Sequence, residues 1–530
     1  MNTHLKMINA QALKAALHDG AEIALLDARE EVPYDARHLL MASCVPLSRL
    51  ELIVDAGVPR RDTRVVWCDD GEGLAQRAAT RMLALGYSKV SVLEGGVAAW
   101  EAAGFRIYSG VHVPSKAFAE VVEHDAGTPW ITAEQLKQLI DSKADIALFD
   151  SRSFEEFHAN SIPTAISVPG AELVYRFADM VPSPKTMVVV NCGGRTRSII
   201  GAQSLINAGV PNKVVSLKNG TQAWHLAGYQ VLKDVSAQAP EVTPAGHAAA
   251  RAAADRVAQR FGIERIDEGS LSQWQADGGT TTYVFDVRSP EEYRSGHVPG
   301  MKNVPGGQLI QETDRHAMVW GARVVLVDDD GVRAVMTAHW MKQMGWDVYA
   351  LTLDLRGRQT QSGSWTPRVL GLDGANVPLI SVAALDERVK AGNTNVVDVD
   401  WSRHYLDGHI PGAWYGVRSR VNEFLPQLPA KECIVFTSQE GSLAKLAAMD
   451  AKAAVPVFVL DGGTAAWRAG GHALEQGATH MAVEPDDIRL KAREQSKDIE
   501  AAMHAYLSWE IELVNQMAVD DDQRFQVMCK

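Results

Sequence analysis

One cysteine of this chain stands in a sequence that could activate its thiol. The stretch VVVNCGGRTRSII, residues 188–200, predicts a buried strand, a glycine turn and a helix that begins near Ser198. Cys192 is the first residue of the turn, and Arg195 and Arg197 lie within it. A thiol beside a helix N-terminus and two guanidinium groups should ionise easily, because each of these features stabilises the thiolate. The same groups could hold a small dianion next to the sulfur.

The alternative for Cys192 is a structural role, since a lone cysteine before a helix is more often a buried apolar residue. Two features of the turn favour a nucleophile instead. Gly193 and Gly194 follow Cys192 directly, and the two arginines come immediately after them. A flexible, electropositive turn of this kind is typical of reactive cysteines.

The composition narrows the class of protein. A chain of 530 residues exceeds one hydrophobic core and predicts roughly three to five domains. The net charge of −13 argues against a nucleic-acid partner, and no basic block suggests a membrane surface. No apolar run approaches the roughly 20 residues of a membrane span. The five cysteines are scattered, without a CxxC pair or a histidine cluster, so we expect a cytoplasmic protein with no metal or organic cofactor.

A unit of about 100 residues occurs four times. Each copy begins with an isoleucine followed by a good helix N-cap residue, at Ile8, Ile131, Ile266 and Ile380. A short apolar strand then ends in aspartate, at Asp27, Asp150, Asp286 and Asp398. The first three copies continue as Asp-x-Arg through Arg29, Arg152 and Arg288, whereas the fourth has Asp400. A second strand, a loop and an Ala-rich helix follow, and three copies close with a glycine turn before Trp100, Trp224 or Trp467.

Strands that alternate with helices at this spacing predict an α/β fold in which each unit is a parallel sheet flanked by helices. We expect domain 1 over 1–110, domain 2 over 125–235, a linker and helix over 236–261, domain 3 over 262–360, domain 4 over 376–475 and a helical tail over 480–530. The tail should pack on a neighbouring domain or on a second copy of the chain, which leaves a homodimer open.

Taken together, these motifs resemble those of the rhodanese (sulfurtransferase) family. The resemblance rests on the Asp-x-Arg strand end, the turns GHVPG at 296–300 and GHIPG at 408–412, the strand–Cys–loop–helix and the LxGG…W closure. It covers almost the whole chain apart from the linker and the tail, and therefore implies four tandem rhodanese-like domains. It also implies that Cys192 carries sulfur as a persulfide and that residues 193–197 form the loop around it.

The substrate-binding candidates are the loop residues Gly193, Gly194, Arg195, Thr196 and Arg197. The guanidinium groups of Arg195 and Arg197 could bind the sulfonate oxygens of a donor such as thiosulfate. For Arg195, a solvated charge on the loop surface is an equally good interpretation as donor binding. We expect Asp150 and Arg152 to support the site as an ion pair that fixes the join between strand and loop.

The loops of the other three domains lack an equivalent cysteine. Gapless alignment from the following helix places Asp69, Asp328 and Ser438 at the position of Cys192. Carboxylates there would raise the pKa of a thiol and repel a dianion in domains 1 and 3. In domain 4 no nearby base suggests an activated Ser438 hydroxyl, and a loop-capping role is expected. We therefore expect domains 1, 3 and 4 to be inactive. Cys68 stands one residue before Asp69, or in register if one gap is allowed, and we expect it to be structural.

The predicted function is transfer of sulfane sulfur from thiosulfate to a thiol, cyanide or protein acceptor through the Cys192 persulfide. A 3-mercaptopyruvate donor remains an alternative, as does a sulfur-relay or scaffold protein whose inert domains bind a partner. A phosphatase is less favoured, because the Cys-x4-Arg loop is one residue shorter than the Cys-x5-Arg loop that encloses a phosphoryl group. The resemblance to family members with two domains implies that domains 1 and 2 could form one pair, with domains 3 and 4 as a second, silent pair.

Overall fold

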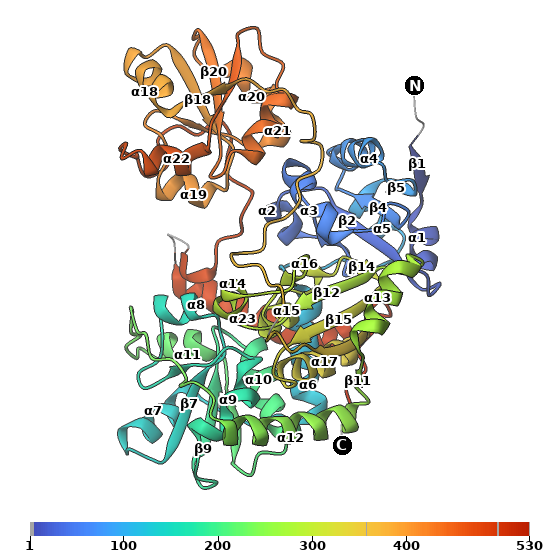
Figure 1. Cartoon of the computed structure of the whole chain (residues 1–530), viewed down its shortest axis with the longest axis vertical. Helices are drawn as coiled ribbons and strands as arrows, with labels where there is room; N and C mark the ends of the chain where they lie inside the picture. The colour runs from blue at the N-terminus through green and yellow to red at the C-terminus, as the bar shows by residue number, and fades with distance from the viewer. Residues whose placement is uncertain (1–4, 357, 495–497, 529–530) are drawn as a thin grey trace. The chain divides into compact units, whose positions relative to one another are not determined.

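The computed structural model describes residues 5–356, 358–494 and 498–528. Four α/β domains follow one another along this part of the chain, each with a sheet between layers of helices (Figure 1). The predicted fold class is therefore confirmed. A helical tail also follows domain 4, as predicted.

In domain 2 the candidate loop follows the carboxyl end of a central strand of a parallel sheet. The strand order is β6-β10-β9-β7-β8, so β9 and β7 lie side by side in its centre. Its elements are β6 Trp130–Ile131, α7 Ala133–Asp141, β7 Ile146–Asp150, α8 Phe154–Ala159, β8 Ile166–Ser167, α9 Glu172–Met180, β9 Met187–Asn191, α10 Thr196–Asn207, β10 Val214–Leu217 and α11 Gly220–Leu226. Because β7 and β9 are parallel, their carboxyl ends bring Asp150 and the Cys192 loop to one edge of the sheet.

Domain 3 repeats this order as β11-β16-β15-β12-β13. Helix α12, Pro244–Phe261, precedes it within the predicted linker segment. Its elements are β11 Glu264–Arg265, α13 Glu268–Asp277, β12 Thr282–Asp286, α14 Pro290–Ser295, β13 Lys302–Asn303, α15 Gly306–Gln311, α16 Thr313–His316, β14 Val319–Trp320, β15 Arg323–Asp328, α17 Arg333–Gln343 and β16 Asp347–Thr352.

Domains 1 and 4 share the same plan. The strand orders are β1-β5-β4-β2 with β3 beside β2 in domain 1, and β17-β21-β20-β18-β19 in domain 4. The elements of domain 1 are β1 Lys6–Ile8, α1 Ala10–Leu17, β2 Ile23–Asp27, α2 Glu31–Ala36, β3 Ser43–Cys44, η1 Leu47–Arg49, α3 Leu50–Gly57, β4 Arg64–Cys68, α4 Leu74–Ala84, β5 Val90–Leu93 and α5 Gly96–Ala102. Those of domain 4 are β17 Leu379–Ile380, α18 Val382–Ala391, β18 Thr394–Asp398, α19 Ser402–Asp407, β19 Trp414–Tyr415, η2 Arg418–Arg420, α20 Val421–Phe424, η3 Leu425–Gln427, β20 Cys433–Thr437, α21 Ser442–Asp450, β21 Val457–Leu460 and α22 Gly463–Ala469.

The four domains group into two compact units, and the grouping differs from the predicted one. One unit comprises residues 1–15, 24–111 and 367–489, and therefore joins domain 1 to domain 4. The other comprises residues 16–23, 112–366 and 490–530, and joins domain 2 to domain 3 and the tail. The expectation that domains 1 and 2 pair, and domains 3 and 4 pair, is wrong.

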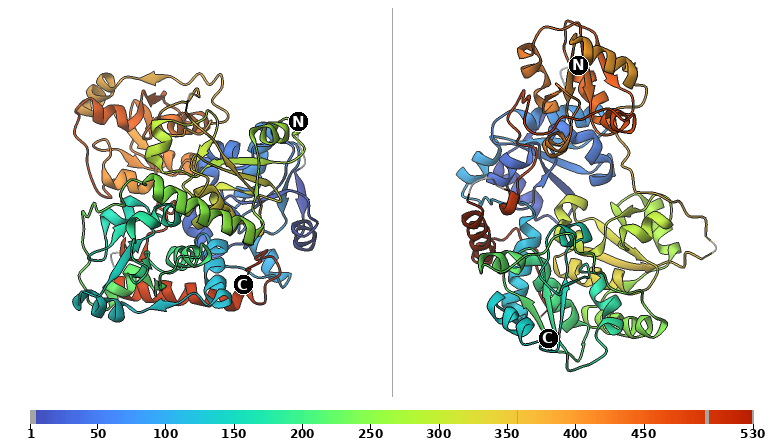
Figure 2. Two further views of the ribbon diagram at one scale, coloured as in Figure 1. Left: turned by 60° about the horizontal axis from the view of Figure 1, so that its bottom comes forward. Right: turned by 90° about the vertical axis from the view of Figure 1, so that its left-hand side faces the viewer.

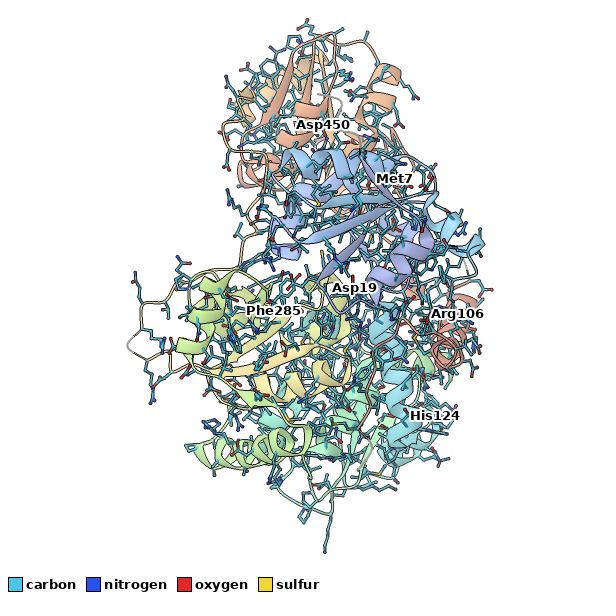
Figure 3. All side chains as sticks on the ribbon, turned by 90° about the vertical axis from the view of Figure 1, so that its right-hand side faces the viewer. Met7, Asp19, Arg106, His124, Phe285 and Asp450 are labelled. Carbon is cyan, nitrogen blue, oxygen red and sulfur yellow. The ribbon has the colours of Figure 1, made fainter. Side chains whose placement is uncertain are left out.

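Buried charges explain the grouping within each unit. In the first unit, Arg418 Nη1 of domain 4 lies 2.6 Å from Glu51 Oε2 of domain 1, and both side chains are buried. Asp450, labelled in Figure 3, accepts a further hydrogen bond from Arg418 Nε at 2.9 Å. In the second unit, Arg333 Nη1 of domain 3 lies 2.8 Å from Glu172 Oε1 of domain 2. Arg418, Glu51 and Glu172 lie outside the shared motifs, whereas Arg333 stands in the domain 3 loop at the position of Arg197. The repeat pattern therefore could not reveal these contacts between domains.

A helix that belongs to none of the four repeats precedes domain 2. Helix α6, Val113–Ala126, packs against α10, and its last turn carries His124, labelled in Figure 3. The tail contains the short helix η4, Ala492–Glu494, and the long helix α23, Ile499–Met517, which packs along α6 (Figure 2). The tail thus packs on a neighbouring domain of the same unit. Among the described helices, none is both long and apolar enough to cross a membrane.

Candidate active site

Cys192 follows the last residue of the central strand β9 and is 2% exposed. Val188, Val189 and Val190 of that strand are fully buried and fix its position in the core. A glycine lets the closing helix α11 approach the loop. Gly220 has φ +54°, and a Cβ there would lie 2.2 Å from the Cys192 carbonyl oxygen. That oxygen accepts a hydrogen bond from Thr221 N at 2.9 Å.

The loop after Cys192 presents a row of backbone N–H groups. Within the described part of the chain, the N–H groups of Gly193 to Arg197 have no protein acceptor. They lie at the N-terminus of α10, where the helix dipole also favours negative charge. Five free donors in the loop that follows Cys192 offer a binding site for an anion, such as a persulfide or a sulfonate.

Asp150 and Arg152 form the ion pair that the sequence predicts, and both side chains are fully buried. Arg152 Nε donates to Asp150 Oδ1 at 2.9 Å, and Nη2 donates to Oδ2 at 2.6 Å. Asn191, which immediately precedes Cys192, donates to the same carboxylate at 3.0 Å. The pair therefore fixes the join between β7, β9 and the loop.

Arg197 lies beside the cysteine and is held by a carboxylate. Its Nη1 donates to Glu156 Oε2 of α8 at 2.5 Å and to Gln308 Oε1 of α15 at 3.1 Å. The side chain keeps 15% of its surface exposed. Lys491 of the tail also lies 3.3 Å from Glu156, so a further cation stands at the same place.

Arg195 is engaged elsewhere. Its Nε and Nη2 donate to the two carboxylate oxygens of Glu120 at 2.6 and 2.7 Å, and Nη2 also contacts Glu123. Both glutamates belong to α6, and the Arg195 side chain is 3% exposed. These contacts favour a structural role, in which Arg195 ties the loop to α6, over the proposed binding of a donor.

The electrostatics of the thiol differ from the simple expectation. Burial raises the pKa of the Cys192 thiol, and the nearby Glu510 carboxylate adds to the rise. The Arg197 charge and hydrogen bonds with Ser198 lower the pKa, but they do not cancel the effect of burial. The sequence shows the cations of the loop but not how deeply the sulfur lies, and so it overstated how readily the thiol ionises.

This raised pKa predicts the pH dependence of sulfur loading. Because the thiolate attacks, the second-order rate constant with a sulfur donor should rise about tenfold per pH unit below the pKa of the thiol. Arg197→Gln should move the profile to higher pH, since it removes a charge that stabilises the thiolate. Stopped-flow loading rates from pH 6 to 9 would measure this, and a flat profile would contradict it.

The tail adds residues to the site that the sequence analysis did not single out. Glu510 of α23 is 1% exposed and accepts a hydrogen bond from the Thr196 hydroxyl at 3.0 Å. Burial and the charges of Arg152 and Arg197 lower the pKa of Arg493 in η4, so a cation stands close to those two arginines. A sequence signal existed for Glu510. The buried stripe of α23 runs Met503, Leu507, Glu510, Leu513 and Met517, and a glutamate within it is unusual.

The other three loops confirm the gapless register. Asp69 Oδ2 accepts from Ala75 N at 3.0 Å, Asp328 Oδ2 from Ala334 N at 2.9 Å and Ser438 Oγ from Ala444 N at 3.3 Å. Each acceptor stands six residues before its donor, the spacing that separates Cys192 from Ser198. Cys68 is therefore one residue early, within β4, fully buried, with its pKa raised well above the usual value by burial and Asp27.

In domains 1, 3 and 4, side-chain oxygens accept hydrogen bonds from backbone N–H groups of the corresponding loops. In domain 3, Gly331 N donates to Asp328, and the N–H groups of Val332 and Arg333 donate to Asp330. The domain 1 loop likewise has Gly71 N donating to Asp69 at 3.2 Å. In domain 4, Gln439 N donates to Asp400 Oδ2 at 2.7 Å. An anionic substrate would have to displace a fixed carboxylate in each of these loops.

Domain 4 has Asp400 in place of the arginine of the Asp-x-Arg motif, next to the buried Asp398. Burial raises the pKa of Asp398 to about 7, and the charge of Asp400, which stands where the other copies have an arginine, adds to the rise. The folded pKa lies above the unfolded value, so the stabilising effect of the neutral carboxyl is present at low pH and is lost as pH rises through 7. As the pH rises from 5 to 8, the free energy of unfolding of Asp398→Asn should therefore increase by about 2–3 kcal/mol relative to that of the natural chain. Denaturant unfolding at both pH values measures this difference, and an unchanged difference would contradict it.

Comparisons with known proteins agree with the four-domain plan. The family model for the rhodanese-like domain matches residues 9–103, 132–227, 267–357 and 381–470. The crystal structure of a thiosulfate sulfurtransferase from Pseudomonas aeruginosa is 44% identical, with a TM-score of 0.96, over 99% of this chain and 100% of that one. A protein of unknown function from Rhodopseudomonas palustris, described as a possible tyrosine phosphatase, is 31% identical over 20% of this chain and 90% of its own (TM-score 0.18). The Alr3790 protein from Anabaena is 26% identical over 20% of this chain and 86% of its own (TM-score 0.19). A search of curated proteins gave no match.

Proposed function

Because this chain belongs to the rhodanese family, we propose that it is a thiosulfate sulfurtransferase and that Cys192 is its nucleophile. One observation carries the proposal. The Cys192 loop keeps five backbone N–H groups free, whereas side-chain oxygens occupy backbone N–H groups in the loops of domains 1, 3 and 4. The relative from Pseudomonas aeruginosa, similar over its whole length, is described as a thiosulfate sulfurtransferase.

The proposed reaction has two steps. In the first, the Cys192 thiolate attacks the sulfane sulfur of thiosulfate, a new S–S bond forms, and the bond to the sulfonate sulfur breaks to release sulfite. In the second, an acceptor thiolate or cyanide attacks the outer sulfur and restores the Cys192 thiolate. The free N–H groups from Gly193 to Arg197 stabilise the anionic persulfide between the steps.

The cations around the loop suit a dianionic donor. Arg197 retains exposed surface beside the cysteine, and Arg493 and Lys491 of the tail lie nearby. Their positive charge attracts thiosulfate and offsets the repulsion between a dianion and the thiolate. Arg195 takes part only indirectly, because Glu120 and Glu123 hold its guanidinium group.

A comparison of donors tests the proposed specificity. We expect kcat/KM to be at least about tenfold higher with thiosulfate than with 3-mercaptopyruvate, because the second negative charge of thiosulfate gains from the extra cations. Steady-state rates with one acceptor measure the ratio. A preference for 3-mercaptopyruvate would reverse the assignment of the donor, and hydrolysis of an aryl phosphate would replace sulfur transfer by phosphatase chemistry.

A relay role stays compatible with the same cysteine. In that case a protein delivers or removes the persulfide sulfur, and the inert domains supply the docking surface.

We propose the cytoplasm as the location, supported by the lack of a disulfide at the four described cysteines, Cys44, Cys68, Cys192 and Cys433.

A further inference from the structure

The C-terminal helix forms one wall of the Cys192 site. Glu510 Oε1 accepts hydrogen bonds from the Thr196 and Tyr506 hydroxyl groups, both at 3.0 Å. Thr196 belongs to the active-site loop, and Tyr506 lies one turn before Glu510 on α23. The wall therefore places a buried carboxylate directly against the loop that holds the reactive sulfur.

The second oxygen of this carboxylate has no protein partner. Glu510 Oε2 is buried and makes no hydrogen bond to any described residue. It lies 3.1 Å from the point that a Cβ on Gly194 would occupy, so it stands over the middle of the loop. Leaving a buried carboxylate oxygen unpaired costs free energy, and a bound hydrogen-bond donor would recover it.

The side chain of Gln222, on α11, also lies close to Gly194. Its Nε2 lies 3.5 Å from the same point above Gly194, and its Oε1 is also buried without a hydrogen-bond partner. Glu510 Oε2 and the Gln222 side-chain amide therefore flank the middle of the loop, and among the described residues each side chain has one buried oxygen without a hydrogen-bond partner. A ligand that satisfies both must offer N–H or O–H donors, and the carboxylate favours a positively charged one.

The two sides of the site differ in charge. Arg197, Lys491 and Arg493 stand on the side of α8 and η4, which suits the dianionic donor. Glu510 and Gln222 stand over Gly194, where a dianion would be repelled. The acceptor of the second step is therefore the reactant that fits the side of Glu510.

We propose that Glu510 and Gln222 recognise the sulfur acceptor, and that this acceptor is a small thiol that bears an ammonium group. The assignment rests on the proposed function, since an acceptor requires a persulfide on Cys192. The ammonium group donates to Glu510 Oε2, the acceptor thiol gives its proton to the anionic persulfide, and the resulting acceptor thiolate attacks the outer sulfur. The bond between the two persulfide sulfurs breaks, the acceptor leaves as a persulfide, and Cys192 is released as a thiolate.

Two thiols of similar size test this directly. Cysteamine and 2-mercaptoethanol differ in an ammonium group against a hydroxyl group. Cys192 is loaded with thiosulfate, or with inorganic polysulfide, and the second-order rate of persulfide loss is measured with each thiol. We expect Glu510→Gln to lower the ratio of the cysteamine rate to the 2-mercaptoethanol rate by about tenfold. Glu512→Gln, an exposed change on the same helix, should leave the ratio unchanged.

Each outcome decides the assignment. An equal loss with both thiols would show that Glu510 only supports the loop, and an unchanged ratio in Glu510→Gln would also overturn the proposal. Gln222→Glu should move the ratio in the opposite direction, because it adds a second carboxylate, and it keeps the test valid if Glu510→Gln folds poorly. If thiosulfate loads no sulfur, polysulfide loading still measures the ratio, so failure of the proposed donor is distinguishable from failure of this inference.

Discussion

Cys192→Ser should lower sulfur transfer from thiosulfate to cyanide by at least about 10⁴-fold, because no other described cysteine lies in an open anion cradle. Serine keeps the size and the hydrogen bonds of the side chain but cannot form a persulfide. The rate of thiocyanate formation measures the effect. Unfolding midpoints of both proteins should agree, since the substitution is nearly isosteric.

Cys68→Ser supplies the matched control. Cys68 is as deeply buried as Cys192, but it lies within β4, and Asp27 and Asp69 stand beside it. We expect its loss to leave the rate of sulfur transfer within about twofold, because the thiol has no path to an anionic donor. A large loss of rate in Cys68→Ser, with Cys192→Ser still active, would move the active site to domain 1.

Arg152→Met should destabilise the second unit by about 3–5 kcal/mol, because it leaves the Asp150 carboxylate buried without its counter-ion. Asp150 also holds Asn191, so the strand end that carries Cys192 should loosen as well. Denaturant unfolding measures the loss of stability. Activity per folded molecule should fall too, since the loop depends on this join.

The chain offers a control with the same local geometry at its surface. Arg356 pairs with Asp354 through the same three hydrogen bonds, from N and Nε to Oδ1 and from Nη2 to Oδ2, but the arginine is 91% exposed. Arg356→Met should not measurably change stability, because water replaces the lost contacts. Equal effects of the two substitutions would show that burial is not what makes the Asp150 pair important.

The repeated motifs carried enough information to predict the fold and to single out Cys192 as the candidate nucleophile. The isoleucine headers, the Asp-x-Arg strand ends and the glycine turns are local signals, and each maps onto a local element of the structure. The gapless register of Asp69, Asp328 and Ser438 held for the same reason, since loop length and the following helix N-terminus fix it.

Contacts between distant segments escaped the sequence analysis. Arg195 binds Glu120 of α6, a helix that belongs to no repeat, so its role could not be deduced from the loop alone. The pairing of domain 1 with domain 4 depends on Arg418 and Glu51, which no motif marks. Glu510 is 314 residues from its partner Thr196. The apolar face of α23 indicates that a glutamate within it is buried, but it does not indicate which residue the glutamate contacts.

The mass of the protein after treatment with thiosulfate tests the central claim most directly. Excess thiosulfate is removed, the intact mass is recorded, and the modified peptide is identified after digestion. We predict the gain of one sulfur atom, carried by Cys192 and absent from Cys192→Ser. No gain in mass, or a sulfur carried by Cys68 or Cys433, would contradict the account.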